Sequence, residues 1–398
     1  MYKIKEISYS NTEPWLVPFE KRLAFLFKAK KEGFKIVLYL YEEPDTSTFR
    51  YRVYNMCQSL ELSLSWRGVY FFAKELERIK RYINEFEVII AVRYRWSIKF
   101  DEFLQLAKKQ KKCIGFDVDD LVYTSKNIPL IMNTLSVNFE KDSNYDYWFA
   151  YTGRLEKSIR ECDYVITTNQ FIKGKLEEDI NYPSYIVPNY MNRLQLMVSE
   201  DYYRQKKIQY SRDDFVIGYF SGTPSHINDF LVVAPELMRL LDEYKDIRLR
   251  IVGFMELPGY MQRYFENHQI ERIPLQNFID LQKYIAEADV NIVPLINNEF
   301  SNCKSELKFF EAGVVGTITC ATPSYVFKQK IKPGKNGFLC NPGEWYETLL
   351  YLYRNRRKGS TDIVKRAYQD SINGYAYYHQ VTLLDEIFDD LCQMTGGN

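Results

Sequence analysis

The sequence lacks any apolar run long enough to cross a bilayer, and its first residues lack the apolar core of a signal peptide. A spanning helix needs roughly 18 to 20 largely apolar residues, and no stretch of the 398 residues comes near that length. Residues Met1–Ser10 hold no apolar core ahead of Pro14 and Trp15. We therefore expect neither a secreted protein nor a transmembrane one.

Cysteine is scarce, and the residues present are far apart. Their number is odd, and no two have the close spacing typical of zinc sites or of a disulfide framework. This pattern favours a protein of the reducing cytoplasm. The seven cysteines are Cys57, Cys113, Cys162, Cys303, Cys320, Cys340 and Cys392.

The chain also lacks an excess of either charge, since its net charge is only +1. The distribution is uneven, however: residues 1–112 carry 22 Lys and Arg against 14 Asp and Glu, and the remainder carries 31 against 38. A basic N-terminal part is typical of a protein with an anionic partner, whether nucleic acid, an acidic membrane face or a phosphate-bearing substrate. An ordinary solvated surface would explain the same charges.

Short β-branched and aromatic runs alternate with longer helical stretches along the whole chain. This alternation predicts an α/β fold of parallel sheets with crossover helices. The predicted strands of the first half are 35–41, 88–92, 113–118, 164–168 and 185–187, with helices at 18–32 and 73–86. Those of the second half are 215–220, 248–252, 270–274, 290–294, 317–320 and 337–339, with helices at about 229–244, 257–267, 281–286 and 305–313.

The pattern divides into two doubly wound domains. Residues 1–190 form the first and residues 215–375 the second, and the polar, Tyr-rich stretch 191–214 without a sustained apolar period is predicted to be the linker. An apolar pattern in 376–398 predicts a closing helix, which we expect to return to the N-terminal domain. Doubly wound domains bind ligands at the carboxyl ends of their strands, so the cleft between the two is the expected site.

The segment 216–229 runs from a predicted strand through a glycine-containing turn into a helix. Thr223 could cap that helix, and Ser221 and Gly222 would let backbone amides approach a ligand. Helix starts favour phosphate because their amides are exposed and their dipole is positive. His226 could donate to a phosphate or a sugar hydroxyl, although a solvent-facing histidine at a helix start is an equally ordinary interpretation.

A second segment combines cations and a carboxylate beside another predicted strand end. At 100° per residue, Lys304, Lys308 and Glu311 would share one face of a helix. A carboxylate can accept both hydroxyls of a ribose, and lysines can neutralise a diphosphate, so this face could hold a nucleotide. An exposed, salt-bridged helix face would have the same composition.

The order of these segments resembles the C-terminal domain of retaining GT-B-fold glycosyltransferases of family 4, the glycosyl transferases group 1. The resemblance covers a strand, a glycine-containing turn and a helix, then Asp-Val-Asn-Ile-Val-Pro-Leu about 80 residues later, then a helix ending in Glu-Ala-Gly, within Val216 to Leu339. The first half adds family-like segments at 51–55, 115–121, 163–169 and 187–189.

The resemblance implies a GT-B fold, in which two Rossmann-like domains face each other across a cleft. It further implies a hexosyl-type transferase with a nucleoside-diphosphate sugar as donor, retention of anomeric configuration, and neither cofactor nor catalytic metal. Glu311 corresponds to the second carboxylate of the family's Glu-x7-Glu pattern, whereas Cys303 stands where the first is expected. The donor-binding residues implied are Ser221, Gly222, Thr223, Lys304, Ser305, Lys308 and Glu311. On this resemblance, Lys304 takes the place of the family's Arg and Lys pair, which this sequence lacks.

Acidic residues gather after one predicted strand of the first half. Asp119 and Asp120, with Asp117, could orient an acceptor hydroxyl or accept its proton. Turn-forming aspartates would look the same, and the literal Asp-x-Asp also matches the metal-binding motif of the GT-A class, which we rank lower. The implied catalytic residues are Asp119, Asp120, His226 and Lys304, and the basic residues that could meet an anionic acceptor are Arg50, Arg52, Arg93 and Arg95.

The expected partners are a nucleotide-sugar donor and a glycan or lipid-diphosphate-linked acceptor, as in bacterial O-antigen or capsule biosynthesis, and not nucleic acid. The helix 18–32 combines apolar and basic residues, so contact with an anionic membrane surface on the inner face of the cell membrane is an alternative to a purely cytoplasmic location. Two other functions remain open: a non-catalytic nucleotide- or glycan-binding protein, which Cys303 favours, and a GT-B-fold epimerase, against which the scarcity of histidine argues.

Overall fold

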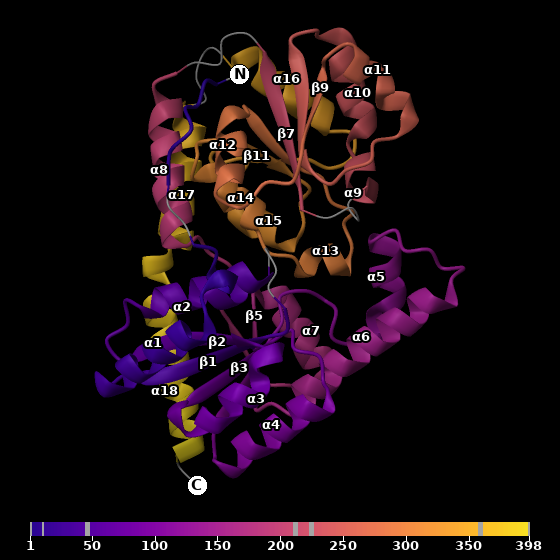
Figure 1. Ribbon diagram of the computed structural model, residues 1–398. Coiled ribbons are helices and arrows are strands. Elements are labelled where there is room, and N and C mark those ends of the chain that lie inside the picture. Colours follow the sequence, from indigo (N-terminus) through magenta and orange to yellow (C-terminus); the bar gives the residue numbers. More distant parts are fainter. Residues whose placement is uncertain are drawn as a thin grey trace.

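A computed structural model shows a molecule of two α/β domains, one above the other (Figure 1). It describes residues 2–9, 12–43, 48–209, 214–222, 227–356 and 361–396. Each domain is built on a six-stranded parallel sheet covered by helices on both faces. The predicted α/β class is therefore confirmed.

The N-terminal sheet has the strand order β2-β1-β3-β4-β5-β6. Its strands are almost completely buried, which is why they read as continuous apolar runs in the sequence. They are β1 (Lys35–Tyr41), β2 (Trp66–Phe72), β3 (Val88–Val92), β4 (Cys113–Asp117), β5 (Tyr164–Thr167) and β6 (Ser184–Ile186).

The C-terminal sheet has the strand order β12-β11-β10-β7-β8-β9. The strand order reverses beside β7, so the crevice at the carboxyl ends of β7 and β10 is the topological switch point of this sheet. The strands are β7 (Phe215–Ser221), β8 (Ile247–Gly253), β9 (Ile270–Ile273), β10 (Val290–Val293), β11 (Ile318–Ala321) and β12 (Phe338–Leu339).

All the predicted strands are present, and the sequence analysis missed one, β2. Arg67 and Gly68 interrupt its apolar run and weaken the signal. Gly68 is needed there because α2 (Asn55–Leu60) lies directly on the strand: an added Cβ would come within 2.9 Å of the Cα of Cys57.

Helices flank the N-terminal sheet, and the predicted helix 73–86 is broken into short turns. The elements are η1 (Pro14–Leu16), α1 (Phe19–Lys31), the π-helical turn η2 (Arg50–Tyr54), η3 (Ala73–Glu75), α3 (Leu76–Ile79), η4 (Lys80–Glu85), α4 (Ile98–Lys109), η5 (Ser125–Asn127), α5 (Ile128–Thr134), α6 (Asp142–Arg160) and α7 (Gln170–Ile180).

In the C-terminal domain the predicted helix 229–244 is divided into two helices. The predicted helix 305–313 is present as one helix, and a short helix that was not predicted precedes it. The helices are α9 (Ile227–Leu231), α10 (Ala234–Glu243), η7 (Gly259–Met261), α11 (Gln262–Glu266), α12 (Asp280–Glu287), α13 (Glu299–Cys303), α14 (Leu307–Gly313), α15 (Tyr325–Lys330) and α16 (Trp345–Asn355). Pro235 near the start of α10 explains the break, because it has no N–H to donate to the carbonyl four residues earlier and its ring would clash with that carbonyl in a continuous helix.

The stretch predicted to be a linker without regular structure contains helix α8 (Arg193–Lys207). Asn192 caps this helix by accepting a hydrogen bond from the amide of Gln195. The helix packs on α12, where the hydroxyl of Ser199 donates to Gln282, and the ammonium of Lys206 donates to the carbonyl of Ala288. Most of the described part of this connection is thus a helix that packs on the C-terminal domain.

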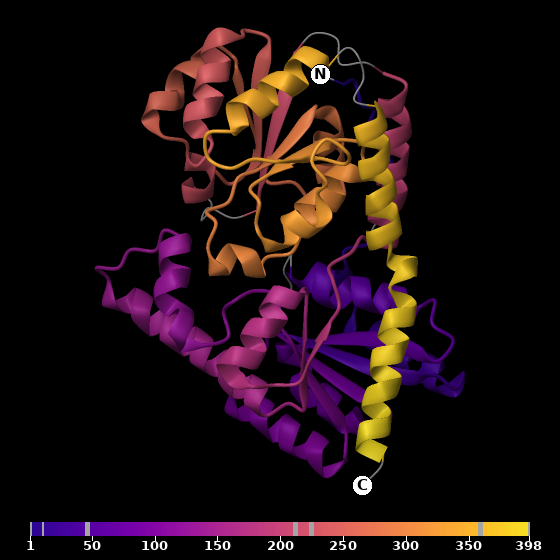
Figure 2. The ribbon, with the colours of Figure 1, turned by 180° about the vertical axis from the view of Figure 1, so that it is seen from behind.

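The last two long helices run along one side of both domains (Figure 2). Helix α17 (Thr361–Tyr375) lies on α14, and after the short turn η8 (Tyr377–His379) helix α18 (Val381–Gly396) lies on the N-terminal domain. There Phe388 packs against Trp66, with ring centroids 5.5 Å apart. The C-terminal helix therefore joins the two domains a second time.

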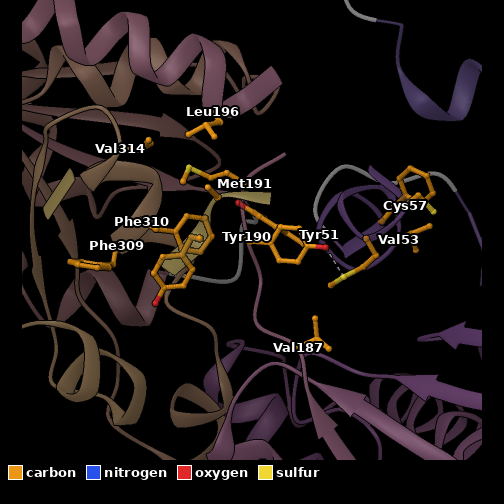
Figure 3. Packing of buried hydrophobic residues seen from close by; sticks show 14 of the residues in the cluster. Tyr51, Val53, Cys57, Val187, Tyr190, Met191, Leu196, Phe309, Phe310 and Val314 are labelled. Atoms are coloured by element: carbon orange, nitrogen blue, oxygen red, sulfur yellow. Dashed lines mark hydrogen bonds between the residues drawn. The ribbon is translucent and has the colours of Figure 1, made fainter. Parts of the chain in front are cut away.

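One apolar cluster continues from one domain into the other. In Figure 3, Phe310 and Val314 of the C-terminal domain lie on one side of Tyr190, and Val53 and Cys57 of the N-terminal domain lie on the other. All five side chains are buried. The cluster fixes the hinge side of the cleft, so that the carboxyl ends of the two sheets face each other.

Candidate functional site

A pocket of about 160 Å³ lies between the two domains, at the carboxyl ends of β7 and β8. Most of its wall comes from the C-terminal domain, and α14 and the π-helical turn η2 supply its charged groups. The lining residues are Arg50, Tyr51, Phe220, Ser221, Gly222, Val252, Leu275, Gln276, Phe278, Leu281, Leu307, Lys308 and Glu311.

Glu311 of α14 supplies the carboxylate of the pocket. It is buried, and its Oε1 lies 3.1 Å from Nη2 of Arg50 in an ion pair across the cleft. The same oxygen accepts a hydrogen bond from the hydroxyl of Tyr51 and another, at 3.4 Å, from the side-chain amide of Gln195. Burial raises the pKa of the Tyr51 hydroxyl, so this group stays a donor.

Arg50 reaches into the pocket from the N-terminal domain. Its guanidinium lies between two aromatic rings, 4.1 Å from the centroid of Tyr51 and 4.4 Å from that of Phe278. Its Nη2 binds Glu311, whereas Nε and Nη1 are buried and have no hydrogen-bond partner in the part of the chain that the structure describes.

Lys308 is the second cation of the pocket, three residues before Glu311 on α14. Its ammonium lies 5.3 Å from the ring centroid of Tyr219. Burial lowers the pKa of Lys308 to about 8, although Asp229 partly opposes this effect. An anion in the pocket would favour the charged form of this lysine.

Lys304 does not share a helix with Lys308 and Glu311, and this part of the prediction is wrong. It follows the last residue of α13 with extended backbone angles, and α14 begins only at Leu307. The carbonyl of Cys303 accepts a hydrogen bond from Asn169 of the N-terminal domain, so the chain there is held across the cleft. The Nζ of Lys304 lies 4.0 Å from Oδ1 of Asp120, also of the N-terminal domain.

The turn after β7 contributes to the pocket as far as it is described. Ser221 is buried and Gly222 exposed, and both line the pocket. Ser305 lies nearby, where its hydroxyl accepts a hydrogen bond of 2.9 Å from Asn189. Thr223 and His226, which the sequence analysis assigns to phosphate binding and catalysis, lie outside the described residues.

Cys303 stands in an apolar environment. Its side chain is fully buried in the cluster of the N-terminal domain, in which Phe300 also lies. Burial raises the pKa of its thiol, so the group stays neutral. No charge replaces the carboxylate that the resemblance leads one to expect at this position.

Arg52 does not face the cleft, and its assignment to acceptor binding is wrong. It is completely buried, and its Nε and Nη2 form a paired contact with the carboxylate of Asp117 at 2.9 and 2.7 Å. Its Nη1 donates to the carbonyl of Val187 and to Asn189. Arg52 thus ties the end of β4 to the chain that leaves the domain.

Arg93, Asp119 and Asp120 form a charged cluster next to the cleft. The guanidinium of Arg93 lies 2.7 Å from Asp119 and 2.6 Å from Asp120. Burial raises the pKa of Asp119, and the charge of Arg93 opposes this effect. Three of the four predicted catalytic residues, Asp119, Asp120 and Lys304, therefore lie in one region. Both aspartates have Arg93 as a neighbouring cation, and Asp120 also has Lys304.

Arg95 lines a larger pocket of about 450 Å³ in the N-terminal domain. Its Nε lies 2.7 Å from a carboxylate oxygen of Glu42, and Lys74 and Arg154 lie on the same wall. The wall follows the ends of β1, β2 and β3, the edge where doubly wound sheets bind ligands.

Residues that the sequence analysis did not assign to the site include Tyr51 and Phe278 of the pocket wall, and Gln195, which lies outside the lining residues. Tyr51 and Gln195 contact Glu311, and Phe278 covers the guanidinium of Arg50. They come from three distant segments, of which only 51–55 had a family-like pattern, and that pattern did not indicate a contact with Glu311. Among the described residues, no group of three or more His, Cys, Asp and Glu side chains could hold a metal ion, and no described helix has the length and apolar character to cross a membrane.

Residues 214–355 match the family model described as glycosyl transferases group 1. This match confirms the resemblance to group 1 glycosyltransferases over these residues of the C-terminal domain. No curated protein matches the chain.

Solved structures with the same fold are glycosyltransferases of low sequence identity. The glycosyltransferase from Rickettsia africae ESF-5 is 12% identical with a TM-score of 0.60, over 90% of this chain and 98% of that one. Sucrose-phosphate synthase from Thermosynechococcus elongatus is 12% identical with a TM-score of 0.58, over 90% and 100%. Anabaena HepE in complex with UDP is 12% identical with a TM-score of 0.56, again over 90% and 100%. The chain thus has the GT-B fold of these glycosyltransferases, and its residues 214–355 match the group 1 model.

Proposed function

We propose that the chain transfers a sugar from a nucleoside-diphosphate sugar to a glycan or lipid-linked acceptor, with retention and without a metal. The C-terminal domain would bind the donor and the N-terminal domain the acceptor. The match of residues 214–355 to group 1 glycosyltransferases supports this assignment of the donor. UDP is the first nucleotide to test, because HepE is similar to this chain and has a structure with UDP-glucose.

The observation that carries the proposal is the position of Glu311 and Lys308 in one pocket at the carboxyl ends of β7 and β8. A carboxylate can accept two ribose hydroxyls, and an ammonium beside it can neutralise a phosphate. Both groups are partly or fully withdrawn from water, which strengthens their interactions with a charged ligand.

The transfer step would depend on positioning and on stabilisation of the leaving diphosphate. Lys304 is the proposed cation at the reacting end of the donor, since it lies beside Asp120 at the mouth of the cleft. Asp119 or Asp120 would orient the acceptor hydroxyl. His226 and Thr223 keep their proposed roles at the turn after β7, together with Ser221, Gly222 and Ser305.

The acceptor would lie in the N-terminal domain, along the pocket of Arg95. Two further basic residues, Lys74 and Arg154, line this pocket, as expected for an anionic acceptor such as a lipid diphosphate. Such acceptors belong to bacterial surface polysaccharide biosynthesis, of O-antigen or capsule, which is the proposed pathway.

Peripheral contact with an anionic membrane is proposed for helix α1. Phe25 and Phe27 are 40% and 43% exposed, and Lys21, Lys28 and Lys31 are exposed on the same helix. Exposed aromatic and basic side chains on one helix are typical of segments that rest on an acidic lipid surface. This location would bring a lipid-linked acceptor to the cleft.

The main alternative is a non-catalytic protein that binds a nucleotide or a glycan. The buried, neutral side chain of Cys303 favours it, because the donor sugar would lose the contact that a carboxylate provides. Donor turnover separates the two functions, since only the transferase would consume the nucleotide sugar.

The test is thermal stabilisation of the wild-type protein by UDP, GDP, dTDP, CMP and their sugar conjugates, with and without a chelator, followed by assay of donor hydrolysis. Selective stabilisation by one nucleoside diphosphate, unchanged by the chelator and followed by turnover, is the expected result. Stabilisation without turnover would favour the non-catalytic protein. Turnover that is lost in the chelator would contradict metal independence.

A further inference from the structure

The guanidinium of Arg50 is buried, and its contacts with the described residues leave some of its hydrogen-bond donors unsatisfied. Its side chain is 7% exposed, and Nη2 has a partner in the carboxylate of Glu311. Nε and Nη1 are buried, and no described residue offers them an acceptor. A buried charged group with unsatisfied donors is costly, because it has lost its hydrogen bonds to water.

A ligand in the pocket beside Arg50 could supply the missing hydrogen-bond acceptors. Arg50, Lys308 and Glu311 are the charged residues of its wall, so the wall carries two cations and one carboxylate. The pocket wall therefore has a net positive charge, and most of the residues around these charges are aromatic or apolar. An anion with several oxygen atoms would satisfy both the charge and the free donors of Arg50, since a guanidinium matches phosphate oxygens in pairs.

Among its described residues, the C-terminal domain supplies no arginine to this pocket. After β7 the described chain contributes Ser221 and Gly222, and Lys308 is the one cation that the described residues of this domain place in the wall. We propose that Arg50, from the opposite domain, binds the phosphates of the nucleoside-diphosphate donor. This inference rests on the proposed function and differs from the role in acceptor binding that the sequence suggested for Arg50.

Binding of the nucleotide would replace the ion pair between Arg50 and Glu311 by contacts of each side chain with the ligand. The pocket of about 160 Å³ is smaller than the roughly 300 to 1,000 Å³ of common ligand sites. A nucleotide therefore has to part the two side chains. Its ribose hydroxyls then donate to Glu311 while its phosphates accept from Arg50, so that neither buried charge loses its partner without gaining another.

A nucleoside without phosphate offers no such exchange. It could bind Glu311 only by leaving Arg50 without a counter-charge in a buried position, which is unfavourable. The ratio of the Kd of the nucleoside to the Kd of the diphosphate reports the groups that bind the phosphates. The change of this ratio in an Arg50 variant therefore isolates Arg50 from Lys308, and from the groups that bind the ribose and the base.

The test compares UDP with uridine by calorimetric titration, and likewise GDP with guanosine and ADP with adenosine, on wild-type protein, Arg50→Met, Arg50→Lys and the control Arg78→Met. Arg78 is half exposed in the same domain and pairs with Glu20 on the surface. We expect Arg50→Met to weaken diphosphate binding about 10- to 100-fold, with little loss for the nucleoside. Arg50→Lys should lie between, and Arg78→Met should equal the wild type.

An unchanged ratio in Arg50→Met overturns the inference while leaving the proposed function intact, provided that the wild type binds the diphosphate. If the wild type binds none of the six compounds, the proposed function fails, and the inference fails with it. Should Arg50→Met not fold, Arg50→Lys decides: it keeps the charge but has no planar fork, and a ratio equal to that of the wild type counts against the pairing with phosphate.

Discussion

Arg50 and Glu311 lie 261 positions apart in the sequence, yet Nη2 of one is 3.1 Å from Oε1 of the other across the cleft. Each side chain is less than a tenth exposed. The pair links the π-helical turn η2 to helix α14, and it occupies the carboxylate that the family resemblance assigns to the ribose. Ligand binding and domain contact therefore depend on the same two charges.

The substitution Glu311→Gln should weaken binding of the nucleoside and of the nucleoside diphosphate alike, about 10-fold or more. The amide keeps the shape of the side chain and can still accept from Tyr51, but it has one oxygen fewer for the ribose and no charge for Arg50. Titration with UDP and uridine measures the effect. A control is Glu299→Gln, whose carboxylate lies on the surface with Lys175. Unchanged affinity in Glu311→Gln would move the nucleotide to another site.

Binding of the diphosphate should weaken as the pH rises from 7.5 to 9. The pKa of Lys308 is lowered to about 8, so the ammonium loses its proton in this range. A terminal phosphate with a pKa near 6 is already fully ionised there, so the lysine dominates the change. Lys308→Met should flatten the pH profile and lower the affinity at pH 7.5. A profile as steep in Lys308→Met as in the wild type would assign the titration to another group.

Lys304→Met should reduce sugar transfer while leaving the Kd of the donor within a few-fold of the wild-type value. The reason is that Lys304 lies at the mouth of the cleft beside Asp120 and does not line the nucleotide pocket. Loss of one group that stabilises the leaving charge costs about 10²- to 10³-fold in rate. Assays of transfer and of binding, with exposed Lys328→Met as control, measure this. Full activity in Lys304→Met would place the role elsewhere.

Arg52→Met should destabilise the fold by about 3 to 5 kcal/mol, because it leaves the carboxylate of Asp117 buried without a counter-charge. Urea unfolding measures the difference. Arg95→Met, whose partner Glu42 remains partly exposed, should cost less than about 1 kcal/mol. Equal stability losses in the two variants would mean that the buried pair does not have the structural role described above.

As the pH falls, the free energy of unfolding of Lys206→Met should rise relative to that of the wild type. Burial lowers the pKa of Lys206 from 10.5 to about 7. Between these values the folded lysine is neutral and the unfolded one is charged, so unfolding takes up a proton and wild-type stability rises with pH, by at most about 1.4 kcal/mol per unit. The difference between wild type and variant at pH 6.5 and pH 9 isolates this group. Lys207→Met, at an exposed neighbour, should show no such trend.

The sheets could be predicted from the sequence because their strands are buried on both faces and appear as apolar runs. The strand β2 escaped because Gly68, which the contact with α2 requires, breaks its run. Helix α8 escaped because it packs against α12 with polar and aromatic side chains and shows no continuous apolar period.

The site was predictable in part. Glu311 and Lys308 follow from one short segment, in which the helical spacing is local information. Lys304 was predicted on the wrong element because the helical spacing was extended back to residue 304, whereas α14 begins only at Leu307. The contacts of Glu311 with Arg50 and Tyr51 depend on how two domains meet, and no local pattern encodes that.

The most direct test of the whole account is a crystal structure of the protein with the nucleoside diphosphate that stabilises it most. We predict that the ribose hydroxyls lie within hydrogen-bond distance of Glu311 and the phosphates within that of Lys308, in the pocket between α14 and η2. A nucleotide bound elsewhere, for example in the larger pocket of Arg95, with Glu311 still paired to Arg50, would contradict it.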